Sequence, residues 1–146
     1  MSEGLLAPGI EGLGLNLSEQ NIADLELFLQ EMGRWNQVHN LTAIEGEMAS
    51  VGLHLIDSIA VLPILRKFFK GPNPMIADLG SGGGLPAIPI AVIEPEWRLT
   101  LIEAVRKKTA FLQHLRGRLG LKNIQVLSAR VEDVAVQQQG QFDAVI

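Results

Sequence analysis

The chain has 146 residues and is 47% hydrophobic, which is enough apolar material for one ordinary domain and excludes disorder by composition. It has no cysteine, which excludes disulfides, thiolate–zinc sites and cysteine nucleophiles, and no cluster of other ligand residues suggests a metal. It shows neither a signal peptide pattern nor a long apolar run, so we expect a cytoplasmic protein without a membrane span.

The charge is unevenly distributed along the chain. The net charge is −4, with −5 in residues 1–73 and +1 in residues 74–146. No acidic residue occurs between Ala104 and Val131, where seven basic residues lie: Arg106, Lys107, Lys108, Arg116, Arg118, Lys122 and Arg130. One basic stripe is therefore possible on a protein that is acidic overall.

The first predicted element is an amphipathic helix that begins near Ser18. Residues 1–16 are rich in Gly, Leu and Pro without a sustained period, and we expect a loose lead-in there. Ser18 is typical of a helix N-cap, and apolar residues then recur at three- and four-residue steps as far as about His39. Residues 36–42 break this period and predict a turn.

A second helix is expected over about 47–62, followed by a short helical piece at 64–69. Gly71-Pro72-Asn73-Pro74 is the clearest boundary, because these residues disfavour a helix. We therefore expect an N-terminal helical region, residues 1–73, that packs on the sheet formed by residues 74–146.

A short apolar run that ends in an acid and a glycine-rich turn follows at residues 75–85, Met-Ile-Ala-Asp-Leu-Gly-Ser-Gly-Gly-Gly-Leu. Because glycine lacks Cβ, this turn can adopt positive φ and lie against a ligand. Pro86 fits the first position of a helix over 86–93, and a helix N-terminus favours a negatively charged group. The segment predicts a strand, a ligand-binding loop and a helix.

Three classes of ligand use such a loop, and the spacing of the glycines separates them. A phosphate-binding P-loop needs Gly-Lys-Ser/Thr after the glycines, where this chain has Leu85-Pro86. The dinucleotide fingerprint would place its third glycine at position 85, so an NAD-dependent oxidoreductase is the weaker alternative. The pattern Asp78-x-Gly80-x-Gly82-x-Gly84 resembles the first motif of S-adenosylmethionine-dependent methyltransferases with the Rossmann-like fold. That resemblance implies that the acid orients the loop and the methionine end, and that the glycines back onto the cofactor.

The rest of the chain alternates strands and helices. Arg98–Ile102 predicts a strand that delivers Glu103 at its C-terminal end, where ligands lie in open α/β sheets. Glu103 could accept hydrogen bonds from both hydroxyls of a ribose, or it could be a solvated turn acid. The remaining elements are a helix over 106–119, a strand over 124–127, a polar loop at 137–141 and a strand that begins at 142. Because a parallel strand normally leads into a crossover helix, we expect an α/β fold whose sheet is truncated after the fourth strand.

Four segments in order narrow the resemblance to one family. They are Asn-Leu-Thr-Ala-Ile at 40–44, His-Leu-Ile-Asp-Ser at 54–58, Asp-Leu-Gly-Ser-Gly-Gly-Gly-Leu-Pro at 78–86 and Val-Arg-Lys-Lys-x-x-Phe-Leu at 105–112. From about residue 18 to its end, the chain resembles the bacterial ribosomal small subunit methyltransferase G family, also called glucose-inhibited division protein B. The resemblance implies transfer of a methyl group from S-adenosyl-L-methionine to N7 of one guanine in 16S ribosomal RNA, with the small ribosomal subunit as partner.

Site residues follow from the resemblance position by position. Gly80 and Leu85 would line the methionine and ribose side, Glu103 the ribose, and Val131 with Glu132 the adenine. The family places an arginine just after the fourth strand, past Ile146. We therefore expect a shortened chain with weak or no activity, and a non-catalytic cofactor- or RNA-binding fragment is the alternative.

No catalytic residue is predicted. N7 of guanine carries a lone pair and no proton, so transfer needs alignment rather than a general base. The basic residues Arg106, Lys107, Arg116 and Arg118 are either an RNA contact or a solvated helix face.

Four further residues have modest roles on sequence grounds. Trp35 could stack on a base or belong to the core. His54 and Asp57 share one helix face, which fits a structural contact with the sheet better than catalysis. His114 is expected on the exposed side of its helix, without a special role.

Overall fold

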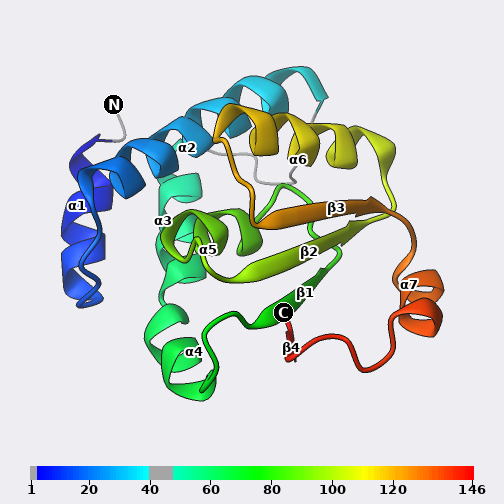
Figure 1. Cartoon of the computed structure of the whole chain (residues 1–146). Helices are drawn as coiled ribbons and strands as arrows, with labels where there is room; N and C mark the ends of the chain where they lie inside the picture. The colour runs from blue at the N-terminus through cyan, green and yellow to red at the C-terminus, as the bar shows by residue number, and fades with distance from the viewer. Residues whose placement is uncertain (1–2, 40–47) are drawn as a thin grey trace.

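The computed structural model describes residues 3–39 and 48–146 (Figure 1). Its elements are, in chain order, α1 (Glu3–Gly12), α2 (Glu19–His39), α3 (Met48–Ile59), α4 (Leu62–Phe68), β1 (Met75–Leu79), α5 (Ala87–Ile93), β2 (Arg98–Glu103), α6 (Arg106–Arg118), β3 (Ile124–Ser128), α7 (Val131–Gln137) and β4 (Ala144–Val145). None of the described helices is long and apolar enough to cross a membrane.

The strands form one four-stranded parallel sheet in the order β3-β2-β1-β4. Leu79 lies opposite Ile102, and Glu103 lies opposite Ser128, so β1, β2 and β3 end at the same edge. The loops that follow these strands therefore meet there, which is where open α/β sheets bind ligands.

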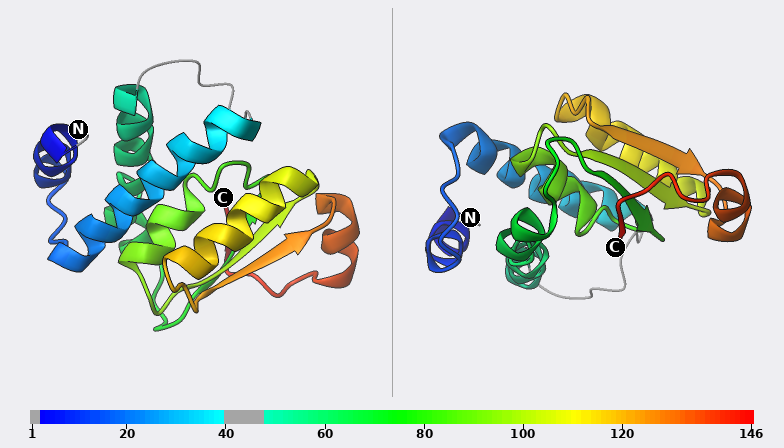
Figure 2. Two further views of the ribbon diagram at one scale, coloured as in Figure 1. Left: turned by 90° about the horizontal axis from the view of Figure 1, so that it is seen from above. Right: turned by 60° about the horizontal axis from the view of Figure 1, so that its bottom comes forward.

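The main core lies on the sheet face that α5 and α6 cover, with α2 packed against these two helices (Figure 2). Successive strand residues point to opposite faces, so Leu99 and Leu101 face this core while Ile102 faces the other side. Phe28 of α2 and Phe111 of α6 are fully buried, and each contributes roughly 1.5–3 kcal/mol. The core joins the N-terminal helices to the sheet without a break.

Residues 3–12 form helix α1, so the expectation of a loose lead-in is wrong. Leu6 and Ile10 lie one turn apart and are 1% and 4% exposed in the core. A Cβ on Gly9 would lie 2.3 Å from Cδ1 of Ile56, so glycine lets α1 approach α3 closely. Burial against a distant helix thus outweighs a local composition that disfavours helix, including Pro8.

The sequence pattern does not predict helix α7, and indicates only a polar loop at 137–141 between the last two strands. Val134 is buried on the far sheet face against Ala77 and Ile102. Glu132 and Asp133 lie in the first turn, where a negative charge is favoured. One buried residue in a seven-residue helix gives too little periodic signal to detect.

The predicted turn at 36–42 is wrong at its start, because α2 continues through residues 36–39. Its other residues, and the segment 40–44 that carries part of the family resemblance, lie outside the described residues.

Candidate cofactor site at the carboxyl edge of the sheet

The glycine loop leaves β1 and crosses over the end of β2. The backbone N–H groups of Gly80 and Ser81 donate to the carbonyl oxygen of Ile102 at 2.9 and 3.2 Å. The φ angles of Gly80, Gly82 and Gly84 are 72°, 56° and 94°, in the left-handed region that favours glycine. The three glycines of the predicted motif are thus the three positions of the loop that have positive φ.

The absence of a side chain has different consequences at Gly80 and at Gly84. A Cβ on Gly84 would lie 2.7 Å from Cγ1 of Ile88 and 3.2 Å from Cδ2 of Leu112, so this glycine packs the loop onto α5 and α6. A Cβ on Gly80 would meet no described atom within 4 Å. Gly80 therefore leaves open space at the loop surface.

Glu103 holds the loop in place. Its side chain is buried, its Oε1 accepts a hydrogen bond from the Gly82 N–H at 2.9 Å, and its Oε2 accepts one from the Val105 N–H at 3.0 Å. Each carboxylate oxygen has a second lone pair, so the clamp leaves acceptor capacity for hydroxyl groups. Glu103 is not the solvated turn acid of the alternative interpretation.

Asp78 lies beneath the loop and is 3% exposed. The pKa of its carboxyl group is raised from 3.8 to about 6, mainly by burial, with the Ser81 hydroxyl lowering it and the charge of Glu103 raising it. Its Oδ2 atom is buried without a hydrogen-bond partner among the described residues. Such an acceptor fits a ligand that supplies a donor or a positive charge.

A pocket of about 620 Å³ opens between the glycine loop and α3. One wall is the loop from Gly80 to Gly83, with Leu85 and Pro86 beside it. The facing wall is α3, with His54, Asp57 and Ser58. His54 and Asp57 are exposed and line this pocket, so the expectation that they make a structural contact with the sheet is wrong. This volume lies in the range of small-molecule sites.

Val131 and Glu132 form the first turn of α7, directly after β3. The Ala129 N–H donates to the carbonyl oxygen of Glu103 at 3.1 Å, which brings this segment beside the loop clamp. Val131 packs on the far sheet face, and Glu132 is exposed. Neither lines the pocket between the loop and α3. A role for them at an adenine stays a prediction.

The four basic residues of α6 do not form one patch. Arg106 and Lys107 lie at the helix N-terminus, near the loop, and the Lys107 Nζ donates to the carbonyl oxygen of His39 at 3.0 Å. Arg116 and Arg118 lie in the last turn, roughly 15 Å further along the axis. Only the first pair shares the sheet edge with the glycine loop.

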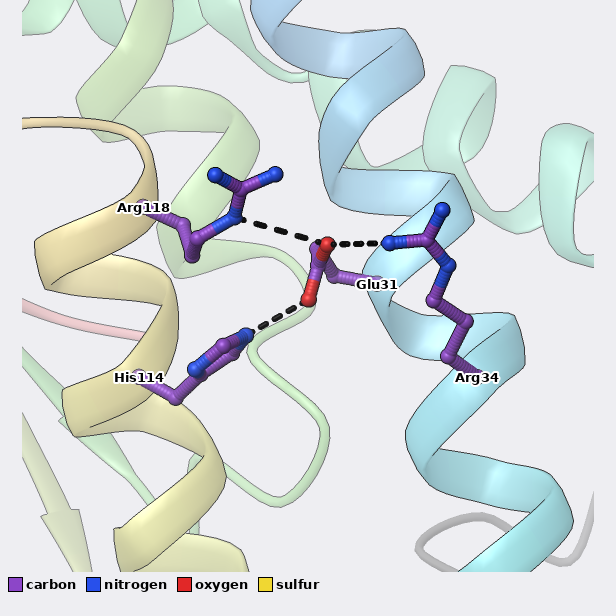
Figure 3. Close-up of polar contacts among 4 residues, drawn as sticks. All are labelled: Glu31, Arg34, His114 and Arg118. Atoms are coloured by element: carbon purple, nitrogen blue, oxygen red, sulfur yellow. Dashed lines mark hydrogen bonds and ion pairs between the residues drawn. The ribbon is translucent and has the colours of Figure 1, made fainter.

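Arg118 also belongs to a cluster around Glu31 (Figure 3). The Glu31 side chain is 5% exposed, and its Oε2 lies 2.5 Å from the His114 Nε2. Its Oε1 contacts Arg34 at 3.1 Å and Arg118 at 3.5 Å. The His114 hydrogen bond lowers the pKa of Glu31, although burial opposes this, and the charges of His114 and the two arginines contribute. The expectation that His114 has no special role is wrong, because it joins α6 to α2.

Trp35 packs beside this cluster. Its ring centroid lies 5.3 Å from that of Phe111 and 5.1 Å from that of His114. Trp35 is partly buried against the main core, so the core interpretation is confirmed. Within residues 3–39 and 48–146, no group of three His, Asp or Glu side chains could hold a metal ion.

Comparison with known proteins identifies close relatives. The family profile described as rRNA small subunit methyltransferase G matches residues 21–146. The chain is 77% identical over its whole length to "Ribosomal RNA small subunit methyltransferase G" of Polynucleobacter asymbioticus and covers 66% of that protein. It is 46% identical over 97% of its length to the protein of the same name from Nitrosospira multiformis and covers 62% of it. The chain thus spans about two thirds of the length of these curated relatives.

Solved structures agree at the level of the fold. A putative O-methyltransferase from Klebsiella pneumoniae has a TM-score of 0.57 at 14% identity, over 97% of this chain and 58% of that one. A putative protein-L-isoaspartate O-methyltransferase from Plasmodium falciparum, in complex with S-adenosyl-L-homocysteine, has a TM-score of 0.54 at 14% identity, over 96% and 70%. The Rossmann-like methyltransferase fold with N-terminal helices is confirmed, and so is the resemblance noted in the sequence. The chain belongs to the rRNA small subunit methyltransferase G family.

Proposed function

We propose that this chain binds S-adenosyl-L-methionine as part of a methyltransferase that acts on N7 of a guanine in 16S ribosomal RNA. The observation that carries the proposal is the loop of Gly80, Gly82 and Gly84, clamped by Glu103 beside the pocket of about 620 Å³. Family membership agrees with this chemistry. A substrate in the small ribosomal subunit would place the protein in the cytoplasm.

Each site residue has a role that its environment supports. Gly80 leaves space for the cofactor against the backbone, and Leu85 supplies apolar contact. The unpartnered Oδ2 of Asp78 suits the methionine end, whose ammonium group donates hydrogen bonds. The free lone pairs of Glu103 suit the ribose hydroxyls. Val131 and Glu132 follow β3 at the edge where the adenine would lie.

The bound cofactor supplies a methyl group on a positively charged sulfur. The protein's task is then to hold N7 in line with that methyl group and to exclude water, because the N7 lone pair needs no general base. Affinity for the RNA would come from phosphate contacts, and Arg106 and Lys107 at the site edge suit this role better than Arg116 and Arg118.

Calorimetric titration of the purified chain with S-adenosylhomocysteine and with NAD tests cofactor binding. We expect saturable binding of the first and none of the second. Replacing Gly80 with Ala should weaken binding about tenfold, because the new Cβ enters the open space. Gly14→Ala is the matched control, since Gly14 also has positive φ and no described atom near its Cβ position but lies far along the chain from the pocket.

Transfer is tested by incubating the chain with isolated small subunits and radiolabelled cofactor, followed by nucleoside analysis for 7-methylguanosine. Label in that nucleoside supports the assignment of N7. Binding of NAD alone would overturn the proposal, and cofactor binding with no label under any condition would favour the non-catalytic alternative.

A further inference from the structure

Asp57 is the carboxylate that faces the pocket from α3. Its side chain is exposed, and within residues 3–39 and 48–146 no hydrogen bond or ion pair engages it. The other two acids of the site already have proposed roles toward the cofactor, Glu103 at the ribose hydroxyls and Asp78 at the methionine end. Asp57 is thus available to a ligand that enters between α3 and the glycine loop.

His54 lies one helical turn before Asp57 and lines the same wall. Residues three apart on a helix share a face, so an imidazole ring and a carboxylate are presented together. The opposite wall includes the side chains of Leu85 and Pro86, which are apolar and uncharged. A planar heterocycle with hydrogen-bond donors on one edge matches this arrangement.

Guanine is the one standard RNA base with two adjacent donors, N1–H and the N2 amino group, on its Watson–Crick edge. A carboxylate accepts both in parallel, as it does from the two nitrogens of an arginine. N7 lies on the side of the purine away from N1 and N2. A guanine whose Watson–Crick edge is held by α3 therefore presents N7 toward the glycine loop. Bases taken out of a stack are commonly read by this edge and by stacking on side chains such as His.

We propose that Asp57 selects guanine in this pocket by accepting hydrogen bonds from N1–H and the N2 amino group, with His54 against the base plane. This inference rests on the proposed function, since it names the residue that chooses and orients the methyl acceptor. It adds a specificity residue to a wall of the pocket that the glycine motif does not include.

Amide NMR titration of the full chain, saturated with S-adenosylhomocysteine, provides the test. The probes are the pentaribonucleotides UUGUU, UUAUU and the inosine version UUIUU, which lacks the N2 amino group. We expect UUGUU to bind about tenfold more tightly than UUAUU, with UUIUU between them and with shifts at residues 54–58 and 80–85. In Asp57→Asn the preference should fall to about twofold or less, with affinity for S-adenosylhomocysteine unchanged.

Asp133→Asn is the matched control, because Asp133 is an exposed acid on α7 and is absent from the pocket lining. It should behave as the unmodified chain, and thermal melting should show both variants folded. If the unmodified chain binds the three RNAs equally and binds S-adenosylhomocysteine normally, the proposal that Asp57 selects guanine is overturned, while the proposed function is unaffected. A loss of S-adenosylhomocysteine affinity in Asp57→Asn, with base preference kept, overturns the Asp57 proposal in favour of a contact with the cofactor. Failure of the unmodified chain to bind S-adenosylhomocysteine would instead overturn the proposed function.

Discussion

At the scale of single residues, the buried carboxyl group of Asp78 opposes folding at neutral pH. Its pKa is raised from 3.8 to about 6, so the folded state binds the proton more tightly than the unfolded state does. The fold therefore loses stability as pH rises from about 4 to about 6, and at higher pH the penalty is constant at about 3 kcal/mol. A buried group that weakens the fold, and whose Oδ2 has no hydrogen-bond partner in the described part of the chain, is typical of a ligand site.

Replacing Asp78 with Asn should therefore stabilise the chain. We expect a gain of about 1–3 kcal/mol in the free energy of unfolding at pH 7.5, measured in urea, and almost none near pH 3.5. Affinity for S-adenosylhomocysteine should fall in the same variant, because the negative charge that would pair with the ammonium group of the methionine end is lost. A destabilised Asn variant at pH 7.5 would mean that the native carboxylate is stabilised by a charge partner.

Gly84 is a second residue whose effect can be predicted from its surroundings. In Gly84→Ala the new Cβ would lie 2.7 Å from Cγ1 of Ile88, close to the backbone of α5, where little adjustment is possible. We expect a loss of about 2–4 kcal/mol in urea unfolding, from the positive φ together with overpacking. Gly140→Ala shares the positive φ but has no described atom within 4 Å of the Cβ position, so it should lose only about 1–2 kcal/mol. Equal losses would assign the whole effect to the backbone.

At the scale of elements, α2 and α6 are joined through one buried carboxylate, Glu31, which contacts Arg34 on its own helix and His114 and Arg118 on α6. The hydrogen bond from His114 holds the pKa of Glu31 below its usual 4.5, so the folded state favours the ionised carboxylate. This stabilisation is fully present above pH 4.5 and is lost as pH falls through the lower folded pKa.

Glu31→Gln should therefore lower the free energy of unfolding by about 1–3 kcal/mol at pH 7 and by progressively less below pH 4.5. Urea unfolding at a series of pH values measures this. Glu26→Gln, on the same helix but outside the cluster, should have little effect at any pH. A loss that is independent of pH would point to packing of the side chain rather than to its charge.

The same elements show what could be predicted from the sequence. The sequence predicts helix α2 because Leu25, Phe28 and Met32 repeat at helical spacing, and the structure buries all three. Helix α1 was not found, because its stability comes from contact with α3 rather than from its own composition. Glu31 and His114 are 83 residues apart in the sequence, and a local sequence pattern cannot predict a contact between residues so far apart.

At the scale of the whole molecule, the carboxyl edge of the sheet was predictable and its contents only partly so. Strand and loop signals placed Asp78, the glycines and Glu103 at one edge, and the structure brings them together there. The approach of α3 to the loop depends on how helices pack across the core, which the sequence pattern does not encode. The division of the α6 cations between two ends likewise appears only when the helix is set against the sheet.

This division leads to a prediction for RNA binding by a chain whose net charge is −4. Replacing Arg106 and Lys107 with Gln removes two cations beside the site, and affinity for a labelled 16S RNA fragment should fall. If both contact phosphates, the slope of log affinity against log salt should become shallower by about 1.4, measured by fluorescence anisotropy in increasing KCl.

The matched control replaces Lys67 and Lys70, exposed cations in the last turn of α4 and just after it, which changes the net charge by the same amount. Because distant charges are screened beyond about 10 Å at 0.1 M salt, this pair should leave the slope nearly unchanged. Equal effects of the two double variants would mean that total charge, rather than the basic end of α6 beside the glycine loop, governs the encounter with RNA.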